Sequence, residues 1–290
     1  MISTRSIGFI AAALVAAGTT TAVCFGDALS VAAKSATSEP EAIASAPFGA
    51  STRPVDVLQN AKPWLTALPN GPESLRGKVV IVNFWTYSCI NSLRALPYLR
   101  AWSARYASKG LVVVGVHAPE FEFEKNAANV RLASKNLGVA YPNVQDNDFA
   151  IWRNFNNEGW PGFYFIDAKG RIRGYRVGEG NYAESEQLLR KLLAEAGHDP
   201  ADIPVAPIPA KGIEVQADWR NLGSPEAYLG YAKATSFMSP GGIRRDEASR
   251  YSAASQLARN QWDLGGTWTV GREFATLDGN AGTIRFRFRV

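Results

Sequence analysis

Two uniformly apolar segments separated by an amphipathic one constrain the fold of this chain most strongly. Residues 79–85 and 111–116 consist mainly of large aliphatic and aromatic side chains, as strands do when both faces of their sheet are covered. Between them, apolar residues recur at intervals of three and four from Leu93 to Tyr106, which predicts a helix with one apolar face. Two such strands joined by a helix run parallel, so the segment predicts a βαβ unit and an α/β fold.

The sequence beyond this unit predicts three more helices and an antiparallel hairpin. The turn-forming stretch 167–170 separates two apolar segments and therefore indicates the hairpin. The predicted strands are 163–166 and 172–177, and the predicted helices are 124–137, 148–155 and 184–195. Together these elements predict a central mixed sheet flanked by helices.

The composition changes after the last predicted helix. Residues 198–212 contain four prolines, which is typical of a stiff, extended linker. Residues 213–290 contain short β-like segments, glycine-rich turns and aromatic residues, and we expect a small all-β module of sandwich or jelly-roll type. Its last predicted strand, 283–290, ends with the chain, so we expect the module to be incomplete. Tyr228, Trp262 and Trp268 are able to stack on sugar rings, but core packing is the interpretation we favour.

The N-terminal segment predicts export from the cytoplasm. An uncharged, apolar run from Ile7 to Phe25 follows Arg5, as in a signal peptide or a membrane anchor, which we assign to residues 1–28. Lipid attachment at Cys24 is a third alternative. Residues 29–54 are rich in Ala, Ser and Pro and predict a flexible tether. We therefore expect a periplasmic or cell-envelope protein, which stays membrane-anchored if the leader is not cleaved.

Charge and cysteine content exclude several classes of protein. Lys and Arg number 31 and Asp and Glu 26, giving a net charge of +5, and the basic residues are scattered, so we expect no nucleic-acid partner. Two cysteines, Cys24 and Cys89, are too few for a disulfide framework or a zinc site built from paired cysteines. The two histidines, His117 and His198, lack ligand spacing. We expect no metal and no cofactor.

The candidate reactive group is Cys89, in the segment 85–92 between the first strand and its helix. A thiol at a helix N-terminus faces unpaired N–H groups and the positive end of the helix dipole, and both stabilise the thiolate. Lowering a thiol pKa from ~8.5 to ~7 raises the thiolate fraction at neutral pH from a few per cent to about half. The alternative is an inert, buried cysteine.

Five segments of the sequence resemble the thioredoxin superfamily, specifically its TlpA-like, redoxin branch. They resemble most closely the thioredoxin-like part of DipZ-type proteins, strongly over residues 62–197 and more weakly beyond the linker. The segments are 84–91, 117–121, 146–152, 159–161 and 178–180. The resemblance implies a thioredoxin fold for residues 55–197 and a carbohydrate-binding-like β-module afterwards. The large multi-span membrane domain of DipZ-type proteins has no counterpart in this sequence.

The resemblance also assigns roles to individual residues. Cys89 matches the attacking cysteine, and Pro161 matches the cis-proline that lies against it and helps bind the substrate chain. Trp85, Tyr87 and Trp160 match the surroundings that bind the substrate chain. Ser92 stands where family members place the second, resolving cysteine, and Asn83 stands where many thioredoxins carry a buried Asp.

Serine at position 92 removes one step of dithiol exchange, because a hydroxyl cannot release a mixed disulfide. Three alternatives follow. Cys89 acts as a monothiol that needs an external thiol or a membrane thiol-disulfide reductant, or the fold is a non-catalytic binding scaffold. The third alternative, a thiol peroxidase, rests on the spacing of Thr86 and Cys89, but Val82 replaces the proline of that pattern.

The expected partners are proteins that carry thiols or disulfides, with a carbohydrate as a further candidate for the β-module. Glu120, Glu122 and Glu124 alternate with two phenylalanines. We expect them in a solvated loop or helix start rather than in a paired-carboxylate site.

Overall fold

The computed structural model describes residues 54–59, 61–218 and 220–289, whose contacts divide them into two compact units. One unit ends at Gln216 and the other begins at Ala217. The expected leader at 1–28, Cys24 within it, and the expected tether up to residue 53 lie outside the described residues.

A six-stranded mixed sheet forms the centre of the first unit, in the order β1-β4-β3-β2-β5-β6. Its strands are β1 (Trp64–Thr66), β2 (Val79–Trp85), β3 (Leu111–His117), β4 (Asn143–Gln145), β5 (Gly162–Ile166) and β6 (Ile172–Val177). β2 and β3 are parallel, whereas β5 is antiparallel to β2 and to β6, so the predicted βαβ unit and hairpin are confirmed. Every residue of β2 is buried, which explains why its sequence shows no polar alternation.

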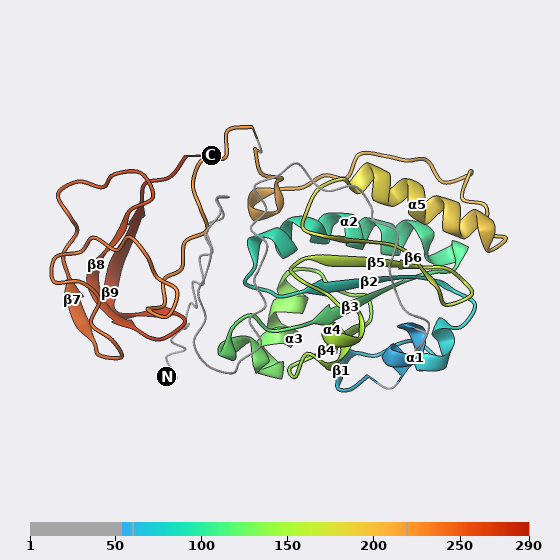
Figure 1. Ribbon diagram of the computed structural model, residues 1–290, viewed down its shortest axis with the longest axis horizontal. Helices are drawn as coiled ribbons and strands as arrows, with labels where there is room; N and C mark the ends of the chain where they lie inside the picture. The colour runs from blue at the N-terminus through green and yellow to red at the C-terminus, as the bar shows by residue number, and fades with distance from the viewer. Residues whose placement is uncertain (1–53, 60, 219, 290) are drawn as a thin grey trace, which may run out of the picture. The chain divides into compact units, whose positions relative to one another are not determined.

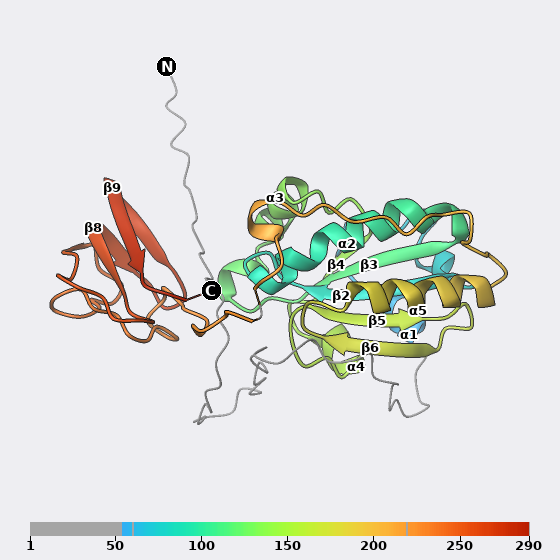
Figure 2. The same cartoon turned by 90° about the horizontal axis from the view of Figure 1, so that it is seen from above.

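Helices cover both faces of this sheet (Figure 1, Figure 2). α2 (Ile90–Tyr106) and α5 (Tyr182–Glu195) pack on one face, where their apolar residues form a core cluster with Trp85. α1 (Pro54–Gln59) and α4 (Ala150–Asn154) pack on the other face, in a cluster with Phe84. Because neighbouring residues of a strand point to opposite faces, β2 contributes to both cores.

The helix predicted over 124–137 begins differently. Residues Glu122–Lys125 form a 3-10 turn, η3, and α3 (Ala127–Asn136) starts only after it. Asn126 separates the two elements, because its side chain accepts a hydrogen bond from the Ala128 N–H at 2.9 Å and so caps α3. The short strands β1 and β4 and the 3-10 turns η1 (Pro72–Leu75) and η2 (Ala107–Lys109) carry too few residues to show a period in the sequence.

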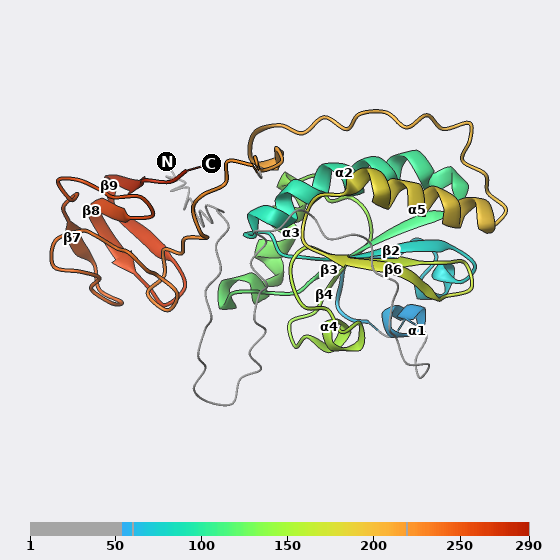
Figure 3. The same cartoon turned by 45° about the horizontal axis from the view of Figure 1, so that its top comes forward.

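The proline-rich segment after α5 is held against the first unit (Figure 3). Arg190 of α5 donates hydrogen bonds to the carbonyls of Ile203 at 2.8 Å and Pro200 at 3.0 Å. Arg100 of α2 forms a two-pronged ion pair with Glu214, at 2.7 and 2.9 Å, at the end of the 3-10 turn η4 (Gly212–Glu214). The segment therefore belongs to the surface of the first unit.

The second unit is an antiparallel three-stranded sheet in the order β7-β8-β9, which confirms an all-β module. Its strands are β7 (Ser249–Tyr251), β8 (Trp262–Val270) and β9 (Ala275–Phe286). Trp262 and Trp268 are only 2% and 4% exposed and belong to its core, which is the role we favoured.

The predicted strand 283–290 was wrong at both ends, because β9 begins at Ala275 and ends at Phe286. Its first part bulges away from β8 between Leu277 and Gly282. This bulged stretch contains glycine, asparagine and alanine and lacks the apolar alternation by which the second part is recognised.

Candidate functional site

Cys89 lies at the junction between β2 and α2, as predicted. It is the N-cap residue of α2, with an extended backbone (φ −81°, ψ 114°), and its carbonyl accepts the Leu93 N–H at 3.1 Å. Its sulfur is in no disulfide with another described residue, and the residue is 5% exposed. The side chain therefore stands where the unpaired N–H groups of the first helical turn lie.

Ser92 lies one helical turn after Cys89 and is fully buried. Its hydroxyl oxygen accepts a hydrogen bond from the Thr86 N–H at 3.4 Å. Ser92, at the resolving position, thus forms a hydrogen bond with the loop between β2 and α2 but provides no second sulfur.

Pro161 follows a cis peptide bond with Trp160. The register of β2 and β5 pairs Phe84 with Gly162, so Pro161 reaches the edge of the sheet at which the loop carrying Cys89 begins. The indole of Trp160 donates to the Ala118 carbonyl at 3.0 Å and packs against Trp152, with ring centroids 4.6 Å apart. The topology therefore brings the thiol segment and the cis-proline segment to one edge of the sheet.

The two aromatic residues before Cys89 occupy different environments. Trp85 is fully buried, and its indole donates to the Asn143 side chain at 3.2 Å. Tyr87 is half-buried, stacks on His117 with centroids 5.6 Å apart, and donates to the Phe123 carbonyl at 3.3 Å. Burial, and then the charge of Glu124, raise the pKa of Tyr87 to about 12. Trp85, which the resemblance placed among the substrate-binding residues, is thus enclosed in the core, whereas Tyr87 is partly exposed.

Glu124 is a site residue that the sequence analysis missed. The expectation of a solvated glutamate was wrong, because Glu124 is fully buried. Its carboxylate accepts hydrogen bonds from the Ser88 hydroxyl at 2.5 Å, the Ser88 N–H at 3.3 Å, the Glu120 N–H at 2.6 Å and the Phe121 N–H at 3.0 Å. Burial raises the pKa of Glu124, and these donated hydrogen bonds oppose the rise.

His117, at the end of β3, is fully buried beside the same loop. Burial lowers its pKa to about 3, so the ring is neutral at physiological pH. Its Nε2 lies 3.4 Å from the Thr86 hydroxyl oxygen, and that hydroxyl also bonds to Glu124. The Nδ1 atom of the ring has no hydrogen-bond partner among the described residues.

A buried ion pair lies on the other side of the site. Arg94, five residues after Cys89, contacts Glu179 at 3.1 Å. Glu179 is 3% exposed, and burial raises its pKa to about 7 against the opposing effect of Arg94. The preceding residue, Gly178, donates its N–H to the Pro161 carbonyl at 2.8 Å. The pair therefore connects the first part of α2 to the segment that supports the cis-proline.

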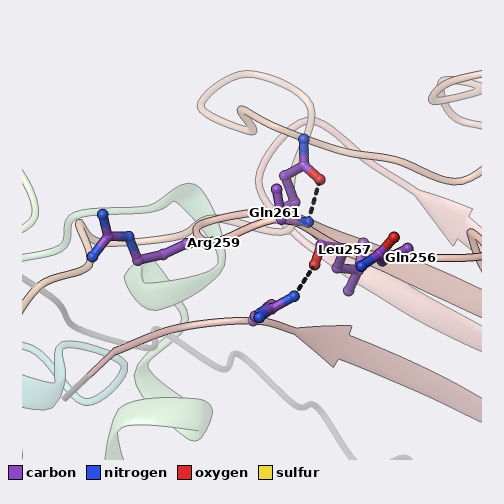
Figure 4. A pocket seen from close by; sticks show the side chains of 6 residues that line it. Gln256, Leu257, Arg259 and Gln261 are labelled. Carbon is purple, nitrogen blue, oxygen red and sulfur yellow. Dashed lines mark hydrogen bonds between the residues drawn. The ribbon is translucent and has the colours of Figure 1, made fainter.

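The second unit contains a groove lined by polar and basic residues (Figure 4). Its lining residues are Gln256, Leu257, Ala258, Arg259, Gln261 and Arg287. Arg287 donates to the Leu257 carbonyl at 2.9 Å, and the Ala258 N–H donates to Gln261 at 2.7 Å. No aromatic ring lines the groove, so it lacks the stacking surface that the sugar interpretation of this module requires.

Within residues 54–59, 61–218 and 220–289, no group of three or more His, Cys, Asp or Glu side chains is arranged to hold a metal ion. Among the same residues, no helix is both long enough and apolar enough to cross a membrane.

Two family models match the chain. Residues 72–175 match the AhpC/TSA family, and residues 224–290 match a domain described as a thioredoxin-like C-terminal domain. The first of these matches, together with the order of the six-stranded sheet, confirms the thioredoxin fold of the first unit.

Several named proteins are similar to parts of this chain. Protein DipZ of Mycobacterium tuberculosis (strain CDC 1551 / Oshkosh) is 39% identical over 237 residues, which cover 80% of this chain and 33% of DipZ. The thiol-disulfide oxidoreductase YkuV of Bacillus subtilis (strain 168) is 26% identical over 143 residues, which cover 49% of this chain and 96% of YkuV. Among solved structures, a thiol-disulfide isomerase from Corynebacterium glutamicum has a TM-score of 0.43 and 22% identity, covering 46% of this chain and 92% of its own. The chain thus spans about a third of the length of its DipZ relatives.

Proposed function

Starting from a chain that belongs to the thioredoxin-like thiol-disulfide oxidoreductases, we propose that it exchanges disulfides through the single thiol of Cys89. The Cys89 thiolate attacks one sulfur of a client disulfide, forms a mixed disulfide, and releases the other client sulfur as a thiolate. An external thiolate then attacks the client sulfur of the mixed disulfide. This second exchange frees the Cys89 thiolate and leaves the external thiol joined to the client.

The observation that carries the proposal is the position of Cys89 relative to Ser92. Cys89 is the N-cap of α2, and the hydroxyl of Ser92 occupies the next helical turn. The helix start supports ionisation of the thiol, whereas the serine cannot attack a mixed disulfide. Pro161, Trp160 and Tyr87 are the proposed client-binding residues, whereas Trp85 is fully buried and belongs to the core cluster of α2 and α5.

The geometry gives less support to a peroxidase. Thr86 matches the threonine of that pattern, but its hydroxyl is engaged by Glu124 and His117. A hydroxyl bonded on both sides is not free to bind a peroxide oxygen. The remaining alternative is a scaffold without thiol chemistry, and the reactivity of Cys89 separates it from the proposed exchange.

The test is the rate of alkylation of Cys89 by iodoacetamide between pH 5 and 10, followed by peptide mass spectrometry, which distinguishes Cys89 from Cys24. We expect a midpoint well below the ~8.5 of a free cysteine. We also expect a stable mixed disulfide with a thiol-activating reagent such as 5,5′-dithiobis(2-nitrobenzoate), released by an added thiol. An ordinary midpoint together with no mixed disulfide would favour the scaffold.

Ser92→Cys provides the complementary test. We expect this variant to form a disulfide with Cys89 and to reduce client disulfides over repeated cycles when a reductant is supplied. Failure to form that disulfide under oxidising conditions would show that position 92 lacks the geometry of a resolving thiol.

We further propose that the protein acts outside the cytoplasm, with clients that carry thiols or disulfides. The apolar run at residues 7–25 supports export. Fractionation of cells expressing the full chain tests this, because a cytoplasmic location would contradict it.

A further inference from the structure

Glu124 differs from Glu122 and Glu179, which each pair with a cation, because nothing positively charged neutralises it. No Lys, Arg or His forms an ion pair with it among the described residues. Its partners are instead two hydroxyls and three backbone N–H groups. Backbone N–H groups can only donate, so they fit an ionised carboxylate and offer no acceptor for a carboxylic proton.

The bonds of Glu124 converge on the residue that precedes the nucleophile. Both the N–H and the hydroxyl of Ser88 donate to its carboxylate. The same carboxylate accepts from Glu120 and Phe121, which belong to the segment after β3. Glu124 therefore joins the peptide that carries Cys89 to a separate loop of the domain.

The negative charge at the thiol segment does not come from the strand that carries it. Asn83, the buried polar side chain of β2, donates to the Gly162 carbonyl at 3.1 Å and bears no charge. Glu124 reaches the thiol segment from the loop after β3 and hydrogen-bonds to Ser88.

We propose that Glu124 is the positioning residue of the Cys89 thiol: it fixes the peptide that presents the sulfur, and its unneutralised charge restrains ionisation of the thiol. The inference rests on the proposed exchange at Cys89. A nearby negative charge disfavours a second one in a site of low dielectric constant. The helix N-terminus favours the Cys89 thiolate, and the charge of Glu124 disfavours it. The reactivity of Cys89 therefore depends on the balance between these two effects.

Other charged and titratable groups around the site leave Glu124 as the dominant charge. On the β2 and β3 side, Tyr87 and His117 are neutral at physiological pH. On α2 and the loop after β6, Arg94 and Glu179 form a pair whose charges offset each other where Glu179 is ionised. In the loop of Glu124 itself, Glu120 is half-buried and donates its N–H to the same carboxylate.

The remaining charges of that loop offset one another. Glu122 is exposed and pairs with Lys125 at 2.6 Å. Glu122→Gln is therefore a matched control, since it removes a carboxylate two residues away from a solvated position.

The experiment measures iodoacetamide alkylation of Cys89 against pH in the full chain, by peptide mass spectrometry, for four proteins. They are the unchanged protein, Glu124→Gln, Ser88→Ala and Glu122→Gln. Glu124→Gln removes the charge, so we expect its midpoint to fall by about one pH unit and its rate below the midpoint to rise about tenfold. Glu122→Gln should leave the midpoint unchanged.

Ser88→Ala removes a hydrogen bond that disperses the charge but keeps the carboxylate, so its midpoint should rise slightly. Opposite shifts in the two variants identify an electrostatic role, and they keep the test valid if Glu124→Gln folds poorly. An unchanged or raised midpoint in folded Glu124→Gln overturns the proposal, as does a lowered midpoint in Ser88→Ala. These shifts are measured relative to the unchanged protein, so they stay informative even if that protein forms no mixed disulfide, which would overturn the proposed function instead.

Discussion

The loops that follow β3 and β6 each bury one glutamate near the thiol segment, and they satisfy it in different ways. Glu124, after β3, accepts only from hydroxyls and backbone N–H groups. Glu179, after β6, pairs with Arg94 on α2, and its second carboxylate oxygen has no hydrogen-bond partner among the described residues. Both have a raised pKa because both are buried.

The difference shows what each loop contributes to the site. Backbone donors fix Glu124 within its own loop, so its charge and its position are set by the local fold. A side-chain ion pair makes Glu179 depend on a residue from another element and on pH. The bonds of Glu124 therefore suit a constant influence on Cys89. The ion pair of Glu179 makes the contact between α2 and the cis-proline segment sensitive to pH.

Removal of the cation that pairs with Glu179 should have the largest effect on the stability of the protein. Arg94→Met leaves a buried carboxylate without its cation, which costs roughly 3 to 5 kcal/mol of unfolding free energy where the carboxylate is ionised. We expect this loss at pH 8.5 and a clearly smaller loss at pH 5.5, where Glu179 binds a proton. Urea unfolding at the two pH values measures it. A loss below about 1 kcal/mol at pH 8.5 would show that the ion pair contributes little to the unfolding free energy.

Glu179 should also give the unchanged protein a pH-dependent stability. Its pKa is about 7 in the folded protein and 4.5 ordinarily, so its contribution to stability is complete below about pH 4.5 and is lost as pH rises through 7. The loss amounts to about 3 kcal/mol. Glu179→Gln should lack it, so the difference in unfolding free energy between the two proteins should change by this amount between pH 4.5 and 8.5. A constant difference across this interval would contradict the raised pKa.

The sequence predicted the β2-α2-β3 unit, the hairpin and the place of Cys89, because long apolar segments and a strand-to-helix junction leave a clear pattern. It did not predict Glu124 as a site residue. Glu120, Glu122 and Glu124 look alike in sequence, and only the 3-10 turn at 122–125 turns the third of them inward. Glu179 was equally hidden, since its role depends on a contact with Arg94, 85 residues away.

A smaller effect tests how firmly the loop after β3 is held. Asn126, two residues after Glu124, caps α3 through its hydrogen bond with the Ala128 N–H. Asn126→Ala should lower the unfolding free energy by about 1 kcal/mol. If the cap also steadies the loop, amide hydrogen exchange at Phe121 and Glu124 should become faster in this variant. Unchanged exchange there would show that Glu124 and its donors hold the loop without help from the helix.

The smallest effect is expected at the surface of the same loop. Lys125→Met removes the exposed ion pair with Glu122, and exposed pairs contribute about 0 to 1 kcal/mol. We expect a change within about 0.5 kcal/mol by urea unfolding, in contrast to Arg94→Met. A loss comparable with that of Arg94→Met would show that burial is not what separates the two loops.

The docked segment after α5 decides where the chain can be divided. A fragment cut after Gly197 would deprive Arg190 of both carbonyl acceptors and Arg100 of Glu214, and it would uncover the side of α2 that these residues cover. A fragment ending at Gln216 keeps every one of these contacts, and also the hydrogen bond of Gln216 with Tyr98 at 3.2 Å. We therefore expect limited proteolysis to leave the segment 200–209 uncut, and recombinant expression of the first unit alone should use the longer fragment.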